Sequence, residues 1–287
     1  MCESCWVPNP SSAPQSPPSR GGLPRRAWLL ATVAAASAPV LAQVDVGKPS
    51  EMRKLVPAET LENSARQEYV KVLADARANG RLAAASDPQL RRLHRIANRL
   101  IPFANQWNRD ITRWRWEVNL INSPEINAWC MPGGKIAFYS GILDKLRLTD
   151  DEVAMIMGHE MAHALREHAR ERLAKTQATG LGLSLAAQLL GWGQIGDVAA
   201  NLGTQLLTLK YSRDDETEAD LVGLEIAARA GYNPQASVSL WQKMMAVKGA
   251  QGSASFLSTH PAGPERIQQL QANLPKVQGL YERAPKG

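Results

Sequence analysis

The pattern of apolar and polar residues along the chain predicts a mainly helical domain with one small sheet. Apolar residues recur every three or four positions through most of the central chain, as they do on one face of an α-helix. Helices are predicted over residues 60–78, 88–101, 153–175, 198–209, 219–229, 234–245 and 264–274. At 114–121 the alternation has period two, which is typical of a half-buried strand. With further strands predicted at 125–130 and 135–139, the fold class is α+β with a small antiparallel sheet.

The first 58 residues differ from this pattern. Residues 1–22 are rich in Pro and Ser, so we expect them to be disordered or to precede the true start. Arg25 and Arg26 then precede an apolar run that ends in small residues, which predicts a cleavable signal peptide at 23–42. Either the Sec or the twin-arginine pathway fits this segment. We expect a polar linker at 43–58, one domain at 59–276 and a tail at 277–287.

Composition and charge narrow the choice of partner. The chain has 287 residues, of which 44% are hydrophobic, and this is enough for one large domain with its own core. The net charge is +6, but basic and acidic residues are interspersed, so nucleic acid is not expected as a partner. Cys2 and Cys5 precede the predicted cleavage point, which leaves Cys130 alone and excludes an internal disulfide in the processed chain.

The candidate chemistry lies in a His-Glu-x-x-His sequence at positions 159–163. A capping box that begins at Thr149 predicts the start of its helix. At 3.6 residues per turn, His159 and His163 lie one above the other, so both imidazoles can bind one zinc ion. Glu160 is about 100° further round the helix, close enough to hydrogen-bond a water on that metal. The motif therefore predicts a zinc site with Glu160 as its general base.

The third ligand must come from elsewhere in the chain. A metzincin would have Gly and His where this chain has Arg166 and Ala169. Glu216 and Asp220 are four residues apart on a predicted helix and share one face. Glu216 can therefore ligate the zinc while Asp220 hydrogen-bonds the free nitrogen of a ligand histidine. Glu218 is the alternative ligand.

These two motifs, in this order, resemble metallopeptidase family 48, which includes HtpX, the CAAX prenyl proteases and the periplasmic proteases BepA and LoiP. Further matches lie at residues 127–134, 140–143, 258–261 and 265–267, and the resemblance covers roughly residues 60 to 274. The chain is most similar to the BepA- and LoiP-type branch, without the repeat domain of BepA-like relatives. The resemblance implies a zincin-like fold in which the sheet lies beside the motif helix.

The resemblance also implies roles for individual residues. One Zn²⁺ per chain would be held by the two motif histidines and Glu216, with water as the fourth ligand. His260 is the candidate to bind the oxyanion, because the family places its His-Pro motif near the zinc. The alternative is that His260 only fixes its loop. Arg213 is the candidate to orient Asp220 or the ligand shell.

Asn127, Ala128, Trp129 and Cys130 form the candidate substrate-binding edge. A free strand edge can pair with an extended substrate backbone and hold its scissile bond over the metal. The alternative is a purely structural hairpin. Cys130 itself is expected to be a small buried residue. Residues 176–196 carry no charge, and we expect a Gly-rich helical hairpin that covers the active site or touches membrane rather than spanning it.

Together these features predict a periplasmic zinc endopeptidase for quality control of envelope proteins. Its expected partners are unfolded or misfolded envelope polypeptides, with peripheral membrane contact. The alternative is a zinc-stabilised holdase that binds unfolded proteins without cutting them, although a structural zinc site would not need Glu160. A membrane-embedded prenyl-protein protease would need several spans that this sequence does not show.

Overall fold

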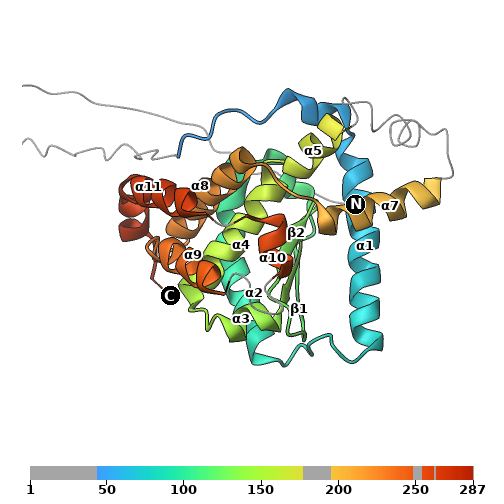
Figure 1. Cartoon of the computed structure of the whole chain (residues 1–287), viewed down its shortest axis with the longest axis horizontal. Coiled ribbons are helices and arrows are strands. Elements are labelled where there is room, and N and C mark those ends of the chain that lie inside the picture. The colour runs from blue at the N-terminus through green and yellow to red at the C-terminus, as the bar shows by residue number, and fades with distance from the viewer. Residues whose placement is uncertain (1–43, 177–194, 248–253, 262, 287) are drawn as a thin grey trace, which may run out of the picture. The chain divides into compact units, whose positions relative to one another are not determined.

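Helix α4 (Asp150–Leu165), which carries the His-Glu-x-x-His motif, packs against both a three-stranded sheet and α8 (Arg213–Arg229) (Figure 1). The computed structural model describes residues 44–176, 195–247, 254–261 and 263–286. The other α-helices are α1 (Ala58–Ala78), α2 (Pro88–Leu100), α3 (Ser140–Lys145), α5 (His168–Thr176), α7 (Ile195–Thr208), α9 (Ala236–Ala246), α10 (Ala254–Thr259) and α11 (Pro264–Arg283). Short 3-10 helices lie at η1 (Glu51–Leu55), η2 (Ile101–Gln106) and η3 (Arg109–Arg113). The predicted mainly helical α+β class, with the sheet beside the motif helix, is confirmed.

The sheet has the strand order β1-β3-β2 and is mixed rather than antiparallel. Its strands are β1 (Glu117–Ile121), β2 (Ala128–Met131) and β3 (Lys135–Tyr139). β2 and β3 are antiparallel, whereas β1 and β3 are parallel. The chain reverses once after β1 and again at the turn after β2, where Gly133 and Gly134 have positive φ angles. Two reversals leave β3 pointing the same way as β1, so the expectation of a wholly antiparallel sheet is wrong.

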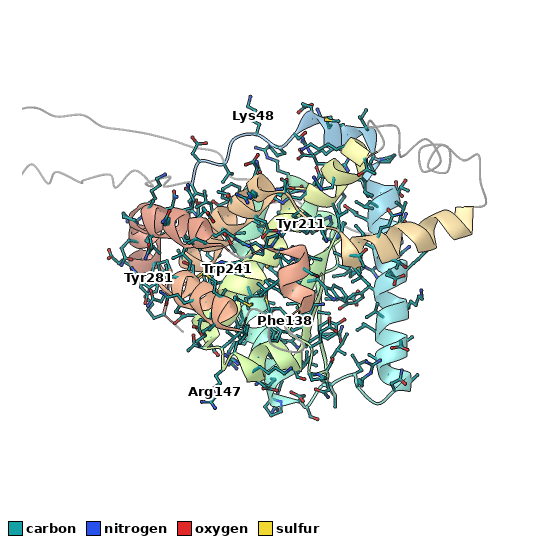
Figure 2. The ribbon with its side chains drawn as sticks, in the orientation of Figure 1. Lys48, Phe138, Arg147, Tyr211, Trp241 and Tyr281 are labelled. Carbon is teal, nitrogen blue, oxygen red and sulfur yellow. The ribbon has the colours of Figure 1, made fainter. Side chains whose placement is uncertain are left out.

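Helices cover both faces of the sheet. Ile136 and Phe138 of β3 point into the main core that contains α4, whereas Ala137 between them packs with Tyr69 of α1. This alternation follows from the strand pleat, which turns successive side chains to opposite faces. Phe138 and, further along the chain, Trp241 are buried inside the fold (Figure 2). The sheet is therefore fixed from both sides, and its β2 edge lies beside the motif helix.

Two predicted helices differ in extent from the observed ones. The helix expected at 153–175 is two helices, because Glu167 adopts a φ of 60° between α4 and α5. The last helix continues past the expected end at 274 to Arg283, through Pro275. Local sequence patterns set where a helix can form, but tertiary packing decides where it ends.

Within the described residues, the expected linker at 43–58 is packed against the domain. Val44 and Val56 are buried, and the backbone N–H of Val44 donates to the carboxylate of Glu225, 2.6 Å away. Val46 and Met52 also pack against the cores, and Arg53 pairs with Glu167, so this stretch is held at several points. The predicted signal peptide and nearly all of the hairpin predicted at 176–196 lie outside the described residues. No helix in the described part of the chain is long and apolar enough to cross a membrane.

α4 and α8 approach each other closely because each has a glycine at the contact. A Cβ atom on Gly223 of α8 would lie 2.6 Å from the backbone nitrogen of His159. A Cβ on Gly158 of α4 would lie 2.9 Å from the carbonyl oxygen of Gly223. Neither position leaves room for a side chain, since both neighbours are backbone atoms. The contact sets the distance between the acidic residues of α8 and the histidines of α4.

We therefore expect Gly223→Ala to lower the free energy of unfolding by about 1–3 kcal/mol, because the added methyl group forces the two helices apart. Gly279→Ala on α11 is the matched control, since its Cβ would meet only the end of the Arg283 side chain. Because Ala has a higher helix propensity than Gly, Gly279→Ala should stabilise the chain by up to about 1 kcal/mol. Urea unfolding of both variants measures the two effects. Equal stability of Gly223→Ala and wild type would contradict the close contact.

Candidate metal centre

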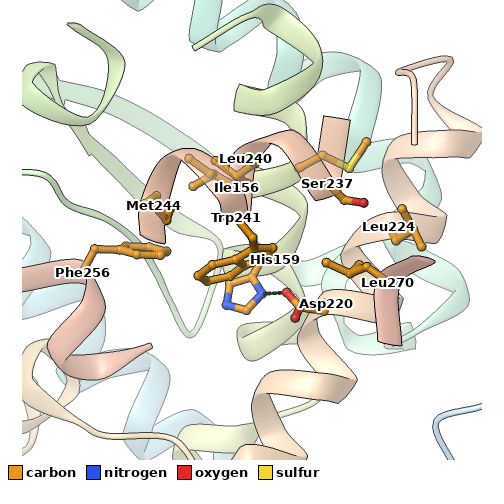
Figure 3. Close-up of a pocket in the computed structure, with 11 residues that line it drawn as sticks. Ile156, His159, Asp220, Leu224, Ser237, Leu240, Trp241, Met244, Phe256 and Leu270 are labelled. Atoms are coloured by element: carbon orange, nitrogen blue, oxygen red, sulfur yellow. Dashed lines mark hydrogen bonds and ion pairs between the residues drawn. The ribbon is translucent and has the colours of Figure 1, made fainter. Parts of the chain in front are cut away.

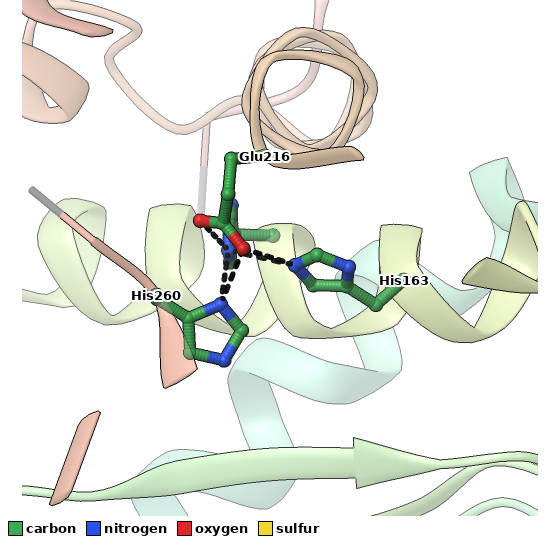
Figure 4. Close-up of side chains that lie close together, drawn as sticks. His163, Glu216 and His260 are labelled. Carbon is green, nitrogen blue, oxygen red and sulfur yellow. Dashed lines mark hydrogen bonds and ion pairs between the residues drawn. The ribbon is translucent and has the colours of Figure 1, made fainter. Parts of the chain in front are cut away.

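Four buried side chains converge between α4, α8 and the residue that follows α10 (Figure 4). His159, His163, Glu216 and His260 each offer one ligand atom, and these atoms all lie within 4.8 Å of one another. The Nε2 atoms of the two motif histidines are 3.1 Å apart, and Glu216 Oε1 lies 3.4 Å from Nε2 of His163. Nδ1 of His260 is 2.9 Å from the same oxygen. The structure thus brings together the three ligands predicted from sequence.

The chemistry of this donor set fits a metal ion. Imidazole nitrogens and one carboxylate, all at most 4% exposed, are typical ligands of zinc. Burial lowers the pKa of His163 well below its usual value, so its ring is neutral and free to bind a cation. The Nε2 atoms of His159 and His163 face each other at 3.1 Å, so at most one of them can hold a hydrogen between them. Oε2 of Glu216 has no well-aligned hydrogen bond among the described residues, although Arg266 lies 2.5 Å away. A divalent cation between these atoms would satisfy them all.

Capping motifs in the sequence fix the start of each helix that carries candidate ligands. The predicted capping box at Thr149 is present at the start of α4, where Glu152 completes it. A second capping box begins α8, where the side chain of Ser212 accepts from the backbone N–H of Asp215. Glu216 is the next residue, so the first turn of α8 places it opposite α4. Capping thus fixes the start of both ligand helices.

Asp220 orients His159, as the sequence predicted for a partner of a ligand histidine. Its Oδ1 lies 3.0 Å from Nδ1 of His159 (Figure 3). Nε2 of His159 is thereby turned toward His163 and His260. Arg266 donates to both oxygens of Asp220 at 2.7 Å and lies 2.5 Å from Glu216 Oε2. Burial would raise the pKa of Asp220, but Arg266 and His159 hold it below its usual value. Apolar residues of α9 and α11, with Trp241 nearest, shield this ion pair from water.

The supporting arginine is Arg266 and not Arg213, so that prediction is wrong. Arg213 is exposed in the first turn of α8, whereas Arg266 contacts both carboxylates of the site. The guanidinium of Arg266 also lies 3.6 Å from the ring centre of Trp241. The signal for Arg266 was in the sequence, because it belongs to the Glu-Arg-Ile match at 265–267. Proximity along the chain favoured Arg213, and only the packing of α11 on α8 brings Arg266 into place.

The predicted base and the predicted substrate edge line one small cavity. Glu160 is 2% exposed, and burial raises its pKa above the usual value. It shares the cavity with His260, with Asn127 and with the β2 residues Ala128, Trp129 and Cys130. β2 is one of the two edge strands of the sheet, so an edge strand lines the cavity. Burial raises the pKa of the Cys130 thiol well above its usual value, as expected for an inert buried cysteine.

His260 lies closer to the ligand atoms than an oxyanion-binding group needs to. Its Nδ1 is 3.3 Å from Nε2 of His159, while its Nε2 lies 3.5 Å from a carboxylate oxygen of Glu160. The ring of Phe256 stacks on the imidazole at a centre distance of 4.6 Å. The structure therefore places His260 where a fourth ligand would lie, a position that the sequence prediction assigned to water. Its role as a catalytic group stays a prediction.

Two contacts to His163 were missed by the sequence analysis. Tyr211 stacks on its ring at a centre distance of 3.9 Å. His168 meets the Nδ1 edge of this ring, with 2.9 Å between the two Nδ1 atoms, and burial lowers the pKa of His168 to about 4. Glu218, the alternative third ligand, points to His168 and Arg166 and away from the ligand cluster. The grouping of three histidines within ten residues was the only signal for His168 in the sequence.

Arg266→Ala is expected to lower the free energy of unfolding by about 3–5 kcal/mol, because it leaves the buried carboxylate of Asp220 without its partner. It should also weaken metal binding, since Asp220 and Glu216 both lose a fixed position. Arg213→Ala, at the exposed start of α8, should change stability by less than about 0.5 kcal/mol. Urea unfolding and metal titration of the two variants test this assignment, and similar losses in both would contradict it.

Comparison with known proteins agrees with this geometry. The model of peptidase family M48 matches residues 88–274, which include every candidate ligand. The mitochondrial metalloendopeptidase OMA1 of Schizosaccharomyces pombe is 38% identical over 166 residues, covering 57% of this chain and 48% of that protein. Human metalloendopeptidase OMA1, mitochondrial, is 30% identical over 189 residues, covering 60% and 35%.

For one bacterial relative, the match extends over a larger share of that protein. Metalloprotease LoiP of Escherichia coli is 29% identical over 185 residues, covering 61% of this chain and 69% of that protein. The chain thus spans about half or less of the OMA1 proteins that it matches and about two thirds of LoiP. The family match extends over more than half of the chain and contains the whole ligand cluster, as the sequence motifs indicated. The chain belongs to peptidase family M48.

Proposed function

We propose that this chain is a zinc-dependent endopeptidase whose protein ligands are His159, His163 and Glu216. The observation that carries the proposal is the position of Glu160, which lies buried beside the ligand cluster and opens onto the cavity along β2. A zinc ion held by these residues would act as a Lewis acid, polarising the scissile carbonyl and lowering the pKa of a water molecule. A metal site that served only to stabilise the fold would not need a buried carboxylate there.

Glu160 takes the water proton and delivers it to the leaving amine. Its raised pKa favours this shuttling, because the carboxyl group can hold a proton closer to neutral pH. Asp220 and Arg266 keep His159 in the tautomer whose Nε2 is free for the metal. His260 turns its Nε2 toward Glu160, so it can donate a hydrogen bond to the developing oxyanion once it leaves the ligand cluster.

The free edge of β2 is the proposed track for substrate. An extended peptide paired with β2 would run past Glu160 and the ligand cluster, since these line the same cavity. That cavity has a volume of about 30 Å³, and leucines at the end of α7 close its other side. It holds at most one or two water molecules. A polypeptide can therefore enter only if these leucines and Tyr211 move away from β2.

The proposed setting is the bacterial cell envelope, with misfolded or unassembled envelope polypeptides as substrates and peripheral contact with the membrane. The Arg-Arg pair and apolar run at 23–42 support export, and two of the similar proteins are Escherichia coli metalloproteases. The OMA1 relatives are named as mitochondrial proteins, which makes mitochondria the competing compartment. One structural feature favours a second candidate function, a zinc-stabilised holdase. All ligand atoms are buried, as they would be in a protein that does not cut.

Glu160→Gln should retain bound zinc and lose at least about 100-fold in the rate of hydrolysis, because general acid–base catalysis contributes 10²–10⁴-fold. The assay is cleavage of a reduced, unfolded model protein by the zinc-loaded chain. Glu59→Gln, exposed on α1, is the matched control and should cut at the wild-type rate. Equal cleavage by Glu160→Gln and wild type would exclude the general-base role. Binding of the unfolded protein without cleavage, by all three, would favour the holdase.

An epitope-tagged full chain should be recovered from the periplasm of a Gram-negative host, with its N-terminus at Gln43 after removal of residues 1–42. The physical reason is the apolar run followed by small residues, which signal peptidases recognise. Cell fractionation and N-terminal sequencing measure both outcomes. An unprocessed chain in the cytoplasm, or import of the same chain into isolated yeast mitochondria, would contradict the envelope assignment.

A further inference from the structure

His168 is a buried histidine that the proposed hydrolysis does not use. It begins α5, is 1% exposed, and lies on the side of the His163 ring that faces away from the ligand cluster. Its Nδ1 is 2.9 Å from Nδ1 of His163. Its Nε2 has no hydrogen-bond partner at normal range within the described structure, but Oε2 of Glu218 lies 3.5 Å away. A buried ring nitrogen without a partner is uncommon and calls for an explanation.

The turn between α4 and α5 creates this contact. On a continuous helix, two residues five positions apart would point about 140° away from each other, so His168 could not face His163. The turn is made by Glu167, whose φ of 60° lies in the left-handed region that side chains disfavour. Arg53 and Arg170 hold its carboxylate, with Arg53 Nε at 2.7 Å. The surrounding structure thus maintains an unfavourable backbone conformation whose result is the His163–His168 contact.

We propose that His168 and Glu218 form a hydrogen-bonded relay that positions His163 for the metal. When Nε2 of His163 binds a cation, its hydrogen is on Nδ1, which therefore donates to Nδ1 of His168. His168 has accepted on Nδ1, so its own hydrogen is on Nε2 and points to Glu218. Each ring has one donor and one acceptor, so metal binding sets the direction of the whole chain. This inference rests on the metal site of the proposed function.

The other ligand histidine supports this reading. Nδ1 of His159 donates directly to Asp220, and Arg266 holds that carboxylate. In the relay, His163 reaches a carboxylate through one intervening ring, and Arg166 pairs with Glu218 in the same way. Both carboxylates come from α8, two residues apart and on either side of Ala219. One helix therefore supplies the third ligand and the final acceptors behind the other two, so His168 and Glu218 act as positioning residues.

The test compares two substitutions of His168 by the zinc affinity of the full chain, measured by competition with a chelator. His168→Gln keeps a carbonyl that can accept from His163 and an amide that can donate to Glu218. His168→Phe keeps a ring of similar size but offers neither. We expect His168→Phe to weaken zinc binding about 10- to 100-fold relative to wild type. His168→Gln should lose much less affinity. His94→Phe is the control and should leave zinc affinity unchanged. His94 lies on α2, outside the site, and its Nε2 is 2.9 Å from the carbonyl oxygen of Val118 in β1.

Glu218→Ala removes the acceptor at the far end of the relay and remains informative if His168→Phe does not fold. It should weaken zinc binding by itself, yet add little to His168→Phe in the double variant, because the two residues act through the same hydrogen-bonded chain. Equal loss in His168→Gln and His168→Phe would show that His168 only fills space and would overturn the relay. Wild-type zinc affinity in Glu218→Ala would also overturn it. A wild-type chain that binds no zinc would instead refute the metal site itself, and this inference with it.

Discussion

The contact between Gly158 of α4 and Gly223 of α8 is the constraint on which the site depends. Glu216 and Asp220 reach the motif histidines only because the backbones of these two helices meet without side chains between them. A shift of even a few tenths of an ångström would matter, since metal ligands and their supporting hydrogen bonds tolerate little displacement. The capping boxes fix where α4 and α8 begin, and so fix which residues of each helix face the other. The packing of these two helices therefore sets the geometry of the candidate metal site.

The density of buried charge around this contact follows from the same arrangement. Carboxylates of α8 face the histidines of α4, and burying them would be costly without cations nearby. Arg266 lies between Asp220 and Glu216, and Arg166 pairs with Glu218, so each carboxylate has a basic partner. These pairs hold the ligand rings in one tautomer and one orientation. They also explain why α11 and the turn after α4, which contribute no predicted ligand, belong to the site.

The cavity beside Glu160 lies between the candidate metal site and the sheet, and it is closed. β2 presents its outer edge to Glu160, but leucines at the end of α7 and the ring of Tyr211 occupy the space that a substrate would need. Tyr211 and His260 both contact the ring of His163, so the residues that close the cavity also touch the ligands. Movement that admits a polypeptide would therefore change the ligand environment as well.

The sequence by itself determined where most of the longer helices lie, that His159 and His163 share one face of a helix, and that Glu216 is a candidate ligand, because these depend on periodicity and on spacing within a single helix. It could not determine that β1 and β3 are parallel, or that Glu167 breaks the motif helix, because both depend on packing between segments far apart in sequence. For the same reason it selected Arg213 and overlooked the role of Arg266, which α11 brings to Asp220 from 46 residues away. Local rules choose the residue types, but only the tertiary structure decides which of them meet.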